Sequence, residues 1–290
     1  MKILYISKAD LPDFQNDMLF HGLRSLFGES CEDLNEMWYM YEDTKSKYWN
    51  KLVPENGKSY GRGFTLYGRL KNLKIDRSDI LSKIKNKFYD KIIYGSIFRC
   101  LDYIDIVQNI YEPKDIIFID GEDHTNLYKE LLTRGVYYKR ELVYEPNSYL
   151  KPINFSIPKE CVVENISEKI KEYGTIIPGD FSTYIFEDEE SYNNDYKKSY
   201  YGVTFKKGGW DCLRHYEILM NGCVPYFPNL EYCPKHTMKL FPKNLIIENN
   251  KYLEKNGLSD FYYDHLNKLL KYTREYLTTE HIAKKILYDN

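Results

Sequence analysis

Short apolar runs alternate with helical segments along this chain, and this alternation constrains the fold more than any other feature. KILYIS (Lys2–Ser7), DKIIYGSI (Asp90–Ile97) and KDIIFIDG (Lys114–Gly121) have the length and continuous apolar character of strands buried on both faces. Helical apolar spacing lies between them, in NDMLFHGLRSLF and again in residues 98–107. Buried strands divided by helices favour a parallel sheet, so the first half of the chain predicts an α/β fold.

A second alternation follows KPINFSIP (residues 151–158), whose two prolines indicate a linker. We expect strands at FSTYIF (Phe181–Phe186), YYGVTF (Tyr200–Phe205) and CVPYF, a polar helix at DEESYNNDYKKS, and a helix from Cys212 to Asn221 that ends in a left-handed turn at Asn221-Gly222. Residues 233–242 and LIIE (245–248) continue the alternation, and helices near 259–275 and 279–288 close the chain. The sequence therefore predicts two Rossmann-like domains that face a cleft, residues 1–150 and residues 151–290.

Composition and charge narrow the class of protein. The 290 residues are 43% hydrophobic and 29% charged, as in globular proteins, and 41 Lys and Arg are balanced by 43 Asp and Glu. The chain therefore lacks the global basic excess of a non-specific nucleic-acid binder. Its six cysteines form no CxxC pair, and the sequence has neither a signal-peptide core nor a membrane-spanning stretch. We expect a soluble, cytoplasmic protein.

The segment FKKGGWDCLRHYEILMNGCVPYF (Phe205–Phe227) departs most from this background. Its KKGG follows a predicted strand and precedes a predicted helix, where backbone NH groups favour an anion and glycines let that anion approach. Arg214 and Glu217 are three residues apart and project from one helix face toward the carboxyl edge of the sheet. Arg can clamp a diphosphate and Glu can accept two ribose hydroxyls. An exposed Arg214–Glu217 ion pair, with glycines that only turn the chain, explains the same spacing.

The pattern R-x-x-E-x-x-x-x-G-C-V-P, carried by Arg214, Glu217 and residues 222–225, resembles the donor-binding segment of GT-B glycosyltransferases. It resembles in particular that of the exostosin-like group and related bacterial and viral transferases, which are two-domain Rossmann enzymes. The resemblance implies that Glu217 holds the ribose of a nucleotide sugar. It also implies that Arg214 and the donor loop, which consists of Lys206, Lys207, Gly208 and Gly209, meet the diphosphate. The match is confined to this segment.

The sequence bears on metal dependence through a metal-binding motif that it lacks. GT-A glycosyltransferases hold Mn²⁺ or Mg²⁺ with Asp-x-Asp, and this motif does not occur in the chain. Asp102 and Asp105 come nearest but have two residues between them, and Asp120-Gly-Glu122 is a looser acidic pair. We therefore expect neither a required metal ion nor another cofactor.

The best candidates for a catalytic base lie in IDGEDH, at the end of a predicted buried strand: Asp120, Glu122, Asp123 and His124. Crowded carboxylates beside a His can shift one another's pKa values, and one of them could deprotonate an acceptor hydroxyl. The alternative is a plain turn in which Asp123 caps a helix at HTNLYKELL. His21, in the first predicted helix, is a weaker candidate.

Two further segments have less specific patterns. GRGFTLYG (Gly61–Gly68) lacks dinucleotide-binding spacing, and it is either a solvated loop or an acceptor loop with Arg62, Tyr67 and Arg69 as contacts. YYKREL (Tyr137–Leu142) predicts an element edge with a solvated basic face.

The sequence thus predicts a metal-independent glycosyltransferase that moves a sugar from a nucleotide-sugar donor to a hydroxyl of a glycan or similar acceptor, with nucleic acid left open as an acceptor. A non-catalytic nucleotide- or carbohydrate-binding module of the same fold is the alternative. A nucleotide-dependent oxidoreductase would need a dinucleotide-binding loop, and P-loop, G-x-S-x-G and H-E-x-x-H motifs are also missing from the sequence.

Overall fold

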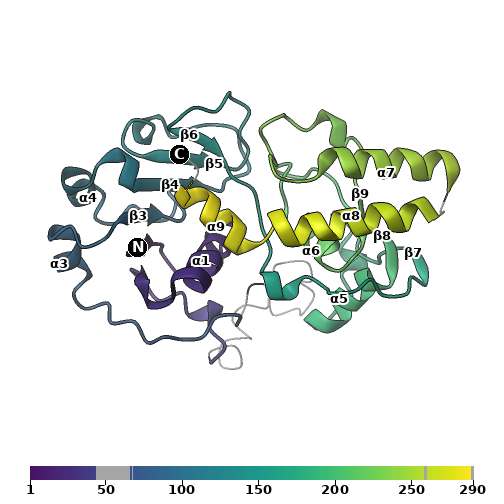
Figure 1. Ribbon diagram of the computed structural model, residues 1–290, viewed down its shortest axis with the longest axis horizontal. Coiled ribbons are helices and arrows are strands. Elements are labelled where there is room, and N and C mark those ends of the chain that lie inside the picture. Colours follow the sequence, from purple (N-terminus) through teal and green to yellow (C-terminus); the bar gives the residue numbers. More distant parts are fainter. Residues whose placement is uncertain (44–65, 67, 258–259, 289–290) are drawn as a thin grey trace.

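The computed structural model describes residues 1–43, 66, 68–257 and 260–288. Within these residues the strands form two sheets, one in each of two lobes that lie side by side (Figure 1). The first sheet has the order β2-β1-β3-β4-β5-β6 and the second has the order β7-β8-β9. All the strand pairs in both sheets are parallel, so the predicted α/β fold with parallel sheets is confirmed.

The strands are β1 (Ile3–Ile6), β2 (Cys31–Asp33), β3 (Lys91–Tyr94), β4 (Ile116–Asp120), β5 (Val136–Lys139), β6 (Leu150–Pro152), β7 (Lys171–Tyr173), β8 (Ser199–Val203) and β9 (Val224–Tyr226). The α-helices are α1 (Phe14–Phe27), α3 (Ile80–Lys85), α4 (Ile104–Ile110), α5 (Glu189–Lys197), α6 (Leu213–Met220), α7 (Lys243–Asn256), α8 (Asp260–Tyr276) and α9 (Thr279–Tyr288). The short 3-10 helices used below are η5 (Lys129–Leu131), η7 (Phe181–Thr183) and η8 (Leu230–Tyr232).

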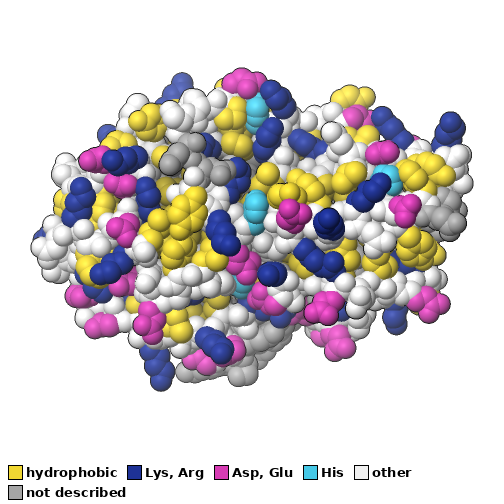
Figure 2. Space-filling model, viewed as in Figure 1, with side chains coloured by type: hydrophobic (Ala, Val, Ile, Leu, Met, Phe, Trp, Pro, Cys, Tyr) yellow, Lys and Arg dark blue, Asp and Glu magenta, His cyan; other side chains and the backbone are white. Residues whose placement is uncertain are grey.

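The first sheet is covered on both faces, which explains its continuous apolar strands. In β1, Ile3 and Tyr5 join the core formed with α1 and α9, whereas Leu4 and Ile6 join the core formed with α3 and α4. This alternation is the period-2 geometry of a strand, applied to a run without polar residues. The face drawn in Figure 2 shows Lys and Arg interspersed with Asp and Glu over both lobes, in keeping with the near-neutral net charge of −2.

Helix α9 follows the second sheet in the chain but packs against α1 in the first lobe (Figure 1). The two helices cross closely at Gly22, because a Cβ at this position would collide with the carbonyl oxygen of Thr279. His21, the weaker candidate base, is buried in this contact, with Nδ1 2.9 Å from Thr279 Oγ1 and Nε2 3.2 Å from Glu160 Oε1. The domain boundary between residues 150 and 151 stays a prediction. Strand β6 continues across it to Pro152, and α9, near the end of the chain, packs in the first lobe.

The predicted strand at FSTYIF is wrong. The segment contains η7 and irregular structure, and the edge strand is instead β7, whose polar sequence KEY gives no strand signal. Gly179 turns the chain with φ +89°, and Asp180 then caps η7 by accepting a hydrogen bond from the Ser182 NH. Only Tyr184 of the aromatic residues in this segment is buried, so the run does not form a pleated, two-faced strand.

Three other expectations about elements need correction. LIIE lies inside α7, because Ile246, Asn249 and Asn250 recur on one buried helix face, and residues 233–242 form a loop instead of a regular element. The helix expected over residues 98–107 begins only at Ile104, since Tyr103 has a left-handed backbone with φ 62°. HTNLYKELL contains only η5, so Asp123 does not cap a helix there. The remaining predicted strands and helices are present, including the turn at Gly222 with φ +61°.

Most of the glycine-rich segment Gly61–Gly68, with Arg62 and Tyr67, lies outside the described residues. Arg69 is described and forms an ion pair with Glu189 of α5, across the two lobes. Among the described helices, none has both the length and the apolar character needed to cross a bilayer.

Candidate functional site

The predicted donor loop connects β8 to α6 at the carboxyl edge of the second sheet. Lys206, Lys207 and Gly208 are exposed there. His215 of α6 fixes the loop, because its Nε2 lies 2.9 Å from the Trp210 carbonyl and its Nδ1 lies 2.8 Å from Thr204 Oγ1. Burial lowers the pKa of His215 to about 3, so the ring is neutral and donates from Nε2 to Trp210 while Nδ1 accepts from Thr204. Helix α6 therefore holds both ends of the loop that precedes it.

Arg214 and Glu217 lie on one face of α6, as predicted, but both are buried. An Arg214 Nη donates to the Tyr184 hydroxyl at 3.3 Å, and Glu217 accepts from the Tyr192 hydroxyl at 2.7 Å. Arg214 Nε has no hydrogen-bond partner among the described residues. The exposed surface pair that spacing alone left open is therefore ruled out by burial. The two side chains face an aromatic layer that a ligand could replace or stack upon.

The loop after β7 meets the donor loop at the same edge of the sheet. Gly179 donates its NH to the Tyr184 hydroxyl at 3.3 Å, the same oxygen that accepts from Arg214. Lys207 lies beside Gly179, with its Nζ 4.0 Å from the position that a Cβ of Gly179 would occupy. One cationic side chain and a backbone NH thus meet at one hydroxyl oxygen, and a second cationic side chain lies beside the same glycine. Such an arrangement of donors suits the oxygens of a phosphate.

The acidic turn, residues 120–123, lies at the carboxyl end of β4, but its members differ in their surroundings. Asp120 is fully buried and accepts from Lys139 Nζ at 2.7 Å and from the Tyr137 hydroxyl at 2.5 Å. Burial lowers the pKa of Lys139, and the Asp120 carboxylate opposes this shift. Both Asp120 oxygens are therefore occupied by partners that hold the end of the strand.

Glu122 and Asp123 are more accessible than Asp120. Glu122 is half-buried, and its carboxylate makes no hydrogen bond or ion pair with a described residue. The Asp123 side chain is 63% exposed and forms an ion pair with Arg140. It also lies against the donor loop, because a Cβ at Gly208 would collide with the Asp123 carboxylate. The structure thus brings together a candidate base and the donor loop, which are far apart in the sequence.

Arg140 and Glu141 are site residues that the sequence prediction missed. YYKREL was expected to present a solvated basic face, but Lys139, Arg140 and Glu141 are at most 3% exposed, so this prediction is wrong. Arg140 donates to the carbonyls of Gly121 at 2.8 Å and Asp211 at 2.5 Å, which links the lobes. Their position in the sequence could have revealed them. Arg140 and Glu141 directly follow a strand, and the carboxyl ends of parallel strands lie at the edge that also carries the acidic turn.

Glu141 also changes the interpretation of the donor loop. Its carboxylate accepts from the NH groups of Trp210 at 3.1 Å and Asp211 at 2.9 Å. It also lies against Gly209, where a Cβ would collide with it. In this conformation carboxylates of the first lobe fill the inner side of the loop. The cationic side chains, Lys207 and Arg214, lie on the side of the loop that faces Gly179.

Asp211 lies at the centre of this junction and is buried. Burial raises its pKa to about 7, although the Arg140 guanidinium and the Phe155 NH act in the opposite direction. The carboxylate accepts from the Phe155 NH at 2.8 Å and from the Tyr216 hydroxyl at 3.0 Å. It therefore ties α6 to the segment that joins the lobes. Among the described residues, no group of three or more His, Cys, Asp or Glu side chains is arranged to hold a metal ion.

Comparison with solved structures gives a structural likeness. Neither a protein-family model nor a curated protein matches the chain. Among solved structures the chain is similar to an alpha-glucosyltransferase in complex with UDP and a 13-mer DNA containing a HMU base, with a TM-score of 0.44 and 12% identity. The alignment covers 100% of this chain and 97% of the other. A likeness of this size assigns neither a family nor a function.

Proposed function

We propose that this protein is a GT-B glycosyltransferase that transfers a sugar from a nucleotide-sugar donor to a hydroxyl group. The observation that carries the proposal is the position of Arg214 and Glu217 on one face of α6, beside Lys207 and the Gly179 NH. These groups lie at the carboxyl edge of a parallel sheet, where α/β folds bind ligands. They combine an acceptor for ribose hydroxyls with donors for a diphosphate.

In the proposed donor complex, Glu217 accepts hydrogen bonds from two ribose hydroxyls. Arg214 exchanges the Tyr184 hydroxyl for a phosphate oxygen, and Lys206 and Lys207 approach the diphosphate from the donor loop. Gly208 and Gly209 keep this loop free of side chains where the first lobe contacts it. Fixed positive charge stabilises the leaving diphosphate in the transition state, which is the role that a metal ion has in GT-A enzymes. The proposed reaction is therefore metal-independent.

The proposed base comes from the first lobe. Asp123 is exposed and lies over the donor loop, so it is our first choice, with Glu122 as the second. The base takes the proton of the acceptor hydroxyl, the hydroxyl oxygen bonds to the anomeric carbon, and the bond from that carbon to the diphosphate oxygen breaks with its electron pair on the diphosphate. Asp120, the third predicted catalytic residue, positions the turn through its ion pair with Lys139.

The proposed acceptor binds on the side of residues 1–150 and the donor on the side of residues 151–290, with a cleft between them that closes to exclude water. The acceptor is a glycan or another hydroxyl-bearing molecule, nucleic acid included. A non-catalytic binding module is the second candidate. It is favoured by the engagement of both Asp120 oxygens and by the burial of Arg214 and Glu217 beneath Tyr184 and Tyr192.

The first test is a thermal-shift panel of UDP, GDP, ADP, dTDP and CMP with their common sugar conjugates, with and without EDTA. A ligand that binds only the native state raises the melting temperature. The proposal predicts a selective shift by one nucleotide that EDTA does not remove. No shift in a protein that melts cooperatively would overturn the donor site. Incubation of the protein with the selected nucleotide sugar and acceptors then separates transfer from binding. If the nucleotide sugar binds but is neither transferred nor hydrolysed, the result favours the non-catalytic binding module.

A further inference from the structure

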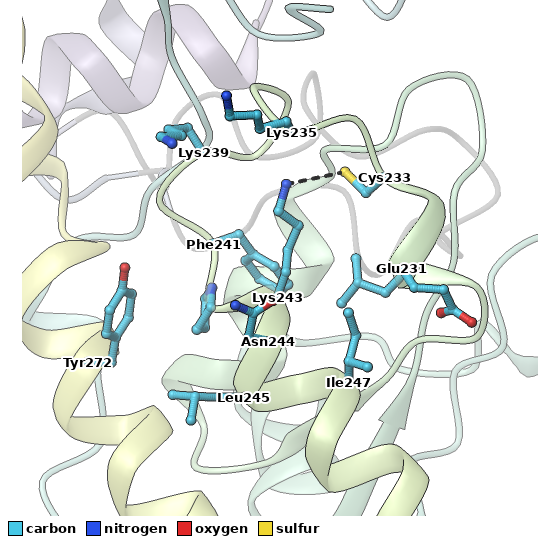
Figure 3. Close-up of a pocket in the computed structure, with 12 residues that line it drawn as sticks. Glu231, Cys233, Lys235, Lys239, Phe241, Lys243, Asn244, Leu245, Ile247 and Tyr272 are labelled. Carbon is cyan, nitrogen blue, oxygen red and sulfur yellow. Dashed lines mark hydrogen bonds between the residues drawn. The ribbon is translucent and has the colours of Figure 1, made fainter.

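A second site is indicated by an open hollow of about 500 Å³ in the second lobe. It lies between the loop that follows η8, the start of α7 and the side of α8 (Figure 3). A volume of this size matches the pockets that bind small molecules. None of the proposed donor residues lines it.

Three lysines give the hollow its charge. Lys235, Lys239 and Lys243 come from the loop and from the first residue of α7, and their side chains lie at the same end of the hollow (Figure 3). The Lys243 ammonium donates to the carbonyls of Pro234 at 3.0 Å and Thr237 at 2.8 Å. Its hydrogen-bond partners in the described part of the chain are therefore uncharged carbonyl groups and the Cys233 sulfur. Its positive charge is held in place without a carboxylate in contact.

Little negative charge offsets these lysines. Lys235 pairs with Glu145 at 3.7 Å, but both side chains are more than 70% exposed, so this pair contributes little. Lys239 forms no ion pair with a described residue. Glu231, the acidic residue on the rim, directs its carboxylate away from the lysines (Figure 3). Burial lowers the pKa of Lys243, and the nearby Lys239 ammonium acts in the same direction, as expected for like charges held close together.

The rest of the lining is apolar or neutral. Phe241, Leu245 and Ile247 form the apolar part of the hollow, and the Tyr272 hydroxyl projects from α8 on the side opposite the loop (Figure 3). The first turn of α7, a helix of 14 residues, contains no acidic side chain, so its dipole adds to the positive potential. The hollow therefore combines anion-binding groups at one end with a surface for an apolar or ring-shaped body.

Helix α6 separates this hollow from the proposed donor site. On one face of α6, the Phe241 ring packs against His215 and Tyr216, with ring centroids 5.7 Å and 5.5 Å apart. On another face, Arg214 contacts Tyr184 and Glu217 contacts Tyr192. The loop that carries Lys235 and Lys239 also contacts the first lobe, since Thr237 donates to the Leu142 carbonyl at 2.9 Å.

We propose that the hollow binds a small organic phosphate, meaning a phosphate group carried on a sugar or another ring. The phosphate accepts hydrogen bonds from Lys235 and Lys239 and is attracted by the positive charge of the Lys243 ammonium, whose own N–H groups stay on Pro234, Thr237 and Cys233, and the ring lies on Phe241 and Leu245. A small ligand fits better than a nucleic-acid backbone, because the lysines gather at one open hollow beside an apolar surface and do not form a track.

The test compares glucose 6-phosphate, ribose 5-phosphate, glucose, inorganic phosphate and a single-stranded oligonucleotide as probes, by calorimetry on the full chain. The proposal predicts that at least one sugar phosphate binds more tightly than inorganic phosphate and that glucose does not bind. Lys239→Ala should weaken that binding by about tenfold, and Lys239→Arg should restore most of it. Lys239 is exposed, so these variants should fold.

Two control variants distinguish this site from others. Lys255→Ala removes an exposed lysine from the far end of α7, and Arg214→Ala removes a proposed donor contact; neither should change binding of the sugar phosphate. The proposal is overturned if no phosphate probe binds, if Lys239→Ala leaves binding unchanged, if Arg214→Ala abolishes it, or if only the oligonucleotide binds.

Discussion

The carboxyl edges of the two sheets differ in the charge of the side chains proposed to act there: carboxylates on the first sheet, beside Lys139 and Arg140, and cations on the second, beside Glu217. The edge of the first sheet presents Glu122, Asp123 and Glu141, whereas the edge of the second presents Lys207 and Arg214. The acidic edge can take a proton and the cationic edge can hold an anion, so each supplies one half of a group-transfer reaction. They meet where Asp123 and Glu141 lie against the glycines of the donor loop. The candidate site is therefore made by the junction and by neither sheet alone.

The two edges also differ in accessibility. Asp123 is largely exposed, but Arg214 is 5% exposed and lies beneath Tyr184. A base must reach a solvated hydroxyl, whereas a group that binds a diphosphate acts more strongly in a site that excludes water. We therefore expect substitutions on the acidic edge to change turnover and substitutions on the cationic edge to change donor affinity.

The largest effect is expected on the acidic edge. Asp123→Asn should lower kcat by roughly 10²- to 10⁴-fold, the usual contribution of a general base, with little change in donor affinity. Glu122→Gln is the matched control and should lower kcat only a few-fold. Steady-state kinetics with the donor from the panel measure both. If Glu122→Gln has the large effect and Asp123→Asn the small one, the base is Glu122, and two small effects would remove the base from this turn.

A smaller effect is expected from Glu217→Gln on the cationic edge. Loss of the charged acceptor for ribose should weaken donor binding by about 10- to 100-fold. Tyr192→Phe is the control, because it removes only the hydroxyl that now donates to Glu217. Calorimetry with a ribonucleotide and its 2′-deoxy form sharpens the test. The wild type should prefer the ribonucleotide and the variant should not, and an unchanged preference would contradict the assigned role.

The last effect concerns the stability of the junction itself and not donor binding or turnover. The pKa of Asp211 is about 7 in the folded state, so between about pH 4 and pH 7 the folded protein holds a proton that the unfolded chain releases. The wild type therefore loses stability as pH rises through this window, relative to Asp211→Asn, which does not titrate. The unfolding free energy of the variant should gain on that of the wild type by about 3 kcal/mol from pH 4 to pH 7.

Denaturant melts of both proteins across this range measure the difference. Arg140 and Glu141 also face Asp211 and are present in both proteins, so their contributions cancel to first order. A difference that is constant with pH would mean that Asp211 is ionised throughout.

The sequence predicts the fold well where burial is complete and poorly where it is partial. β1 and β4 are buried along their whole length, so their apolar runs mark them clearly, whereas β7 is a polar edge strand without such a run. LIIE illustrates the ambiguity of short apolar runs, which fit a strand or one turn of a helix until neighbouring residues decide.

The site was predictable only in part. Arg214 and Glu217 are placed on one face of α6 by helical spacing, so sequence alone could give that relation. The contact of Asp123 with Gly208 depends on how two sheets pack, and local pattern holds no information on it. Arg140 and Glu141 were missed for a related reason, since consecutive charged residues usually face solvent and these are buried by the other lobe.

The central claim is that α6 and the donor loop hold a nucleoside diphosphate, and Arg214→Ala tests it most directly. The measurement is the calorimetric affinity of wild type, Arg214→Ala and Arg214→Lys for the nucleoside diphosphate that gives the largest thermal shift. We predict that affinity falls by about 10- to 100-fold in Arg214→Ala and by less in Arg214→Lys, in variants that still melt cooperatively. Unchanged affinity in a folded Arg214→Ala variant would contradict the donor-site assignment and the proposed function with it.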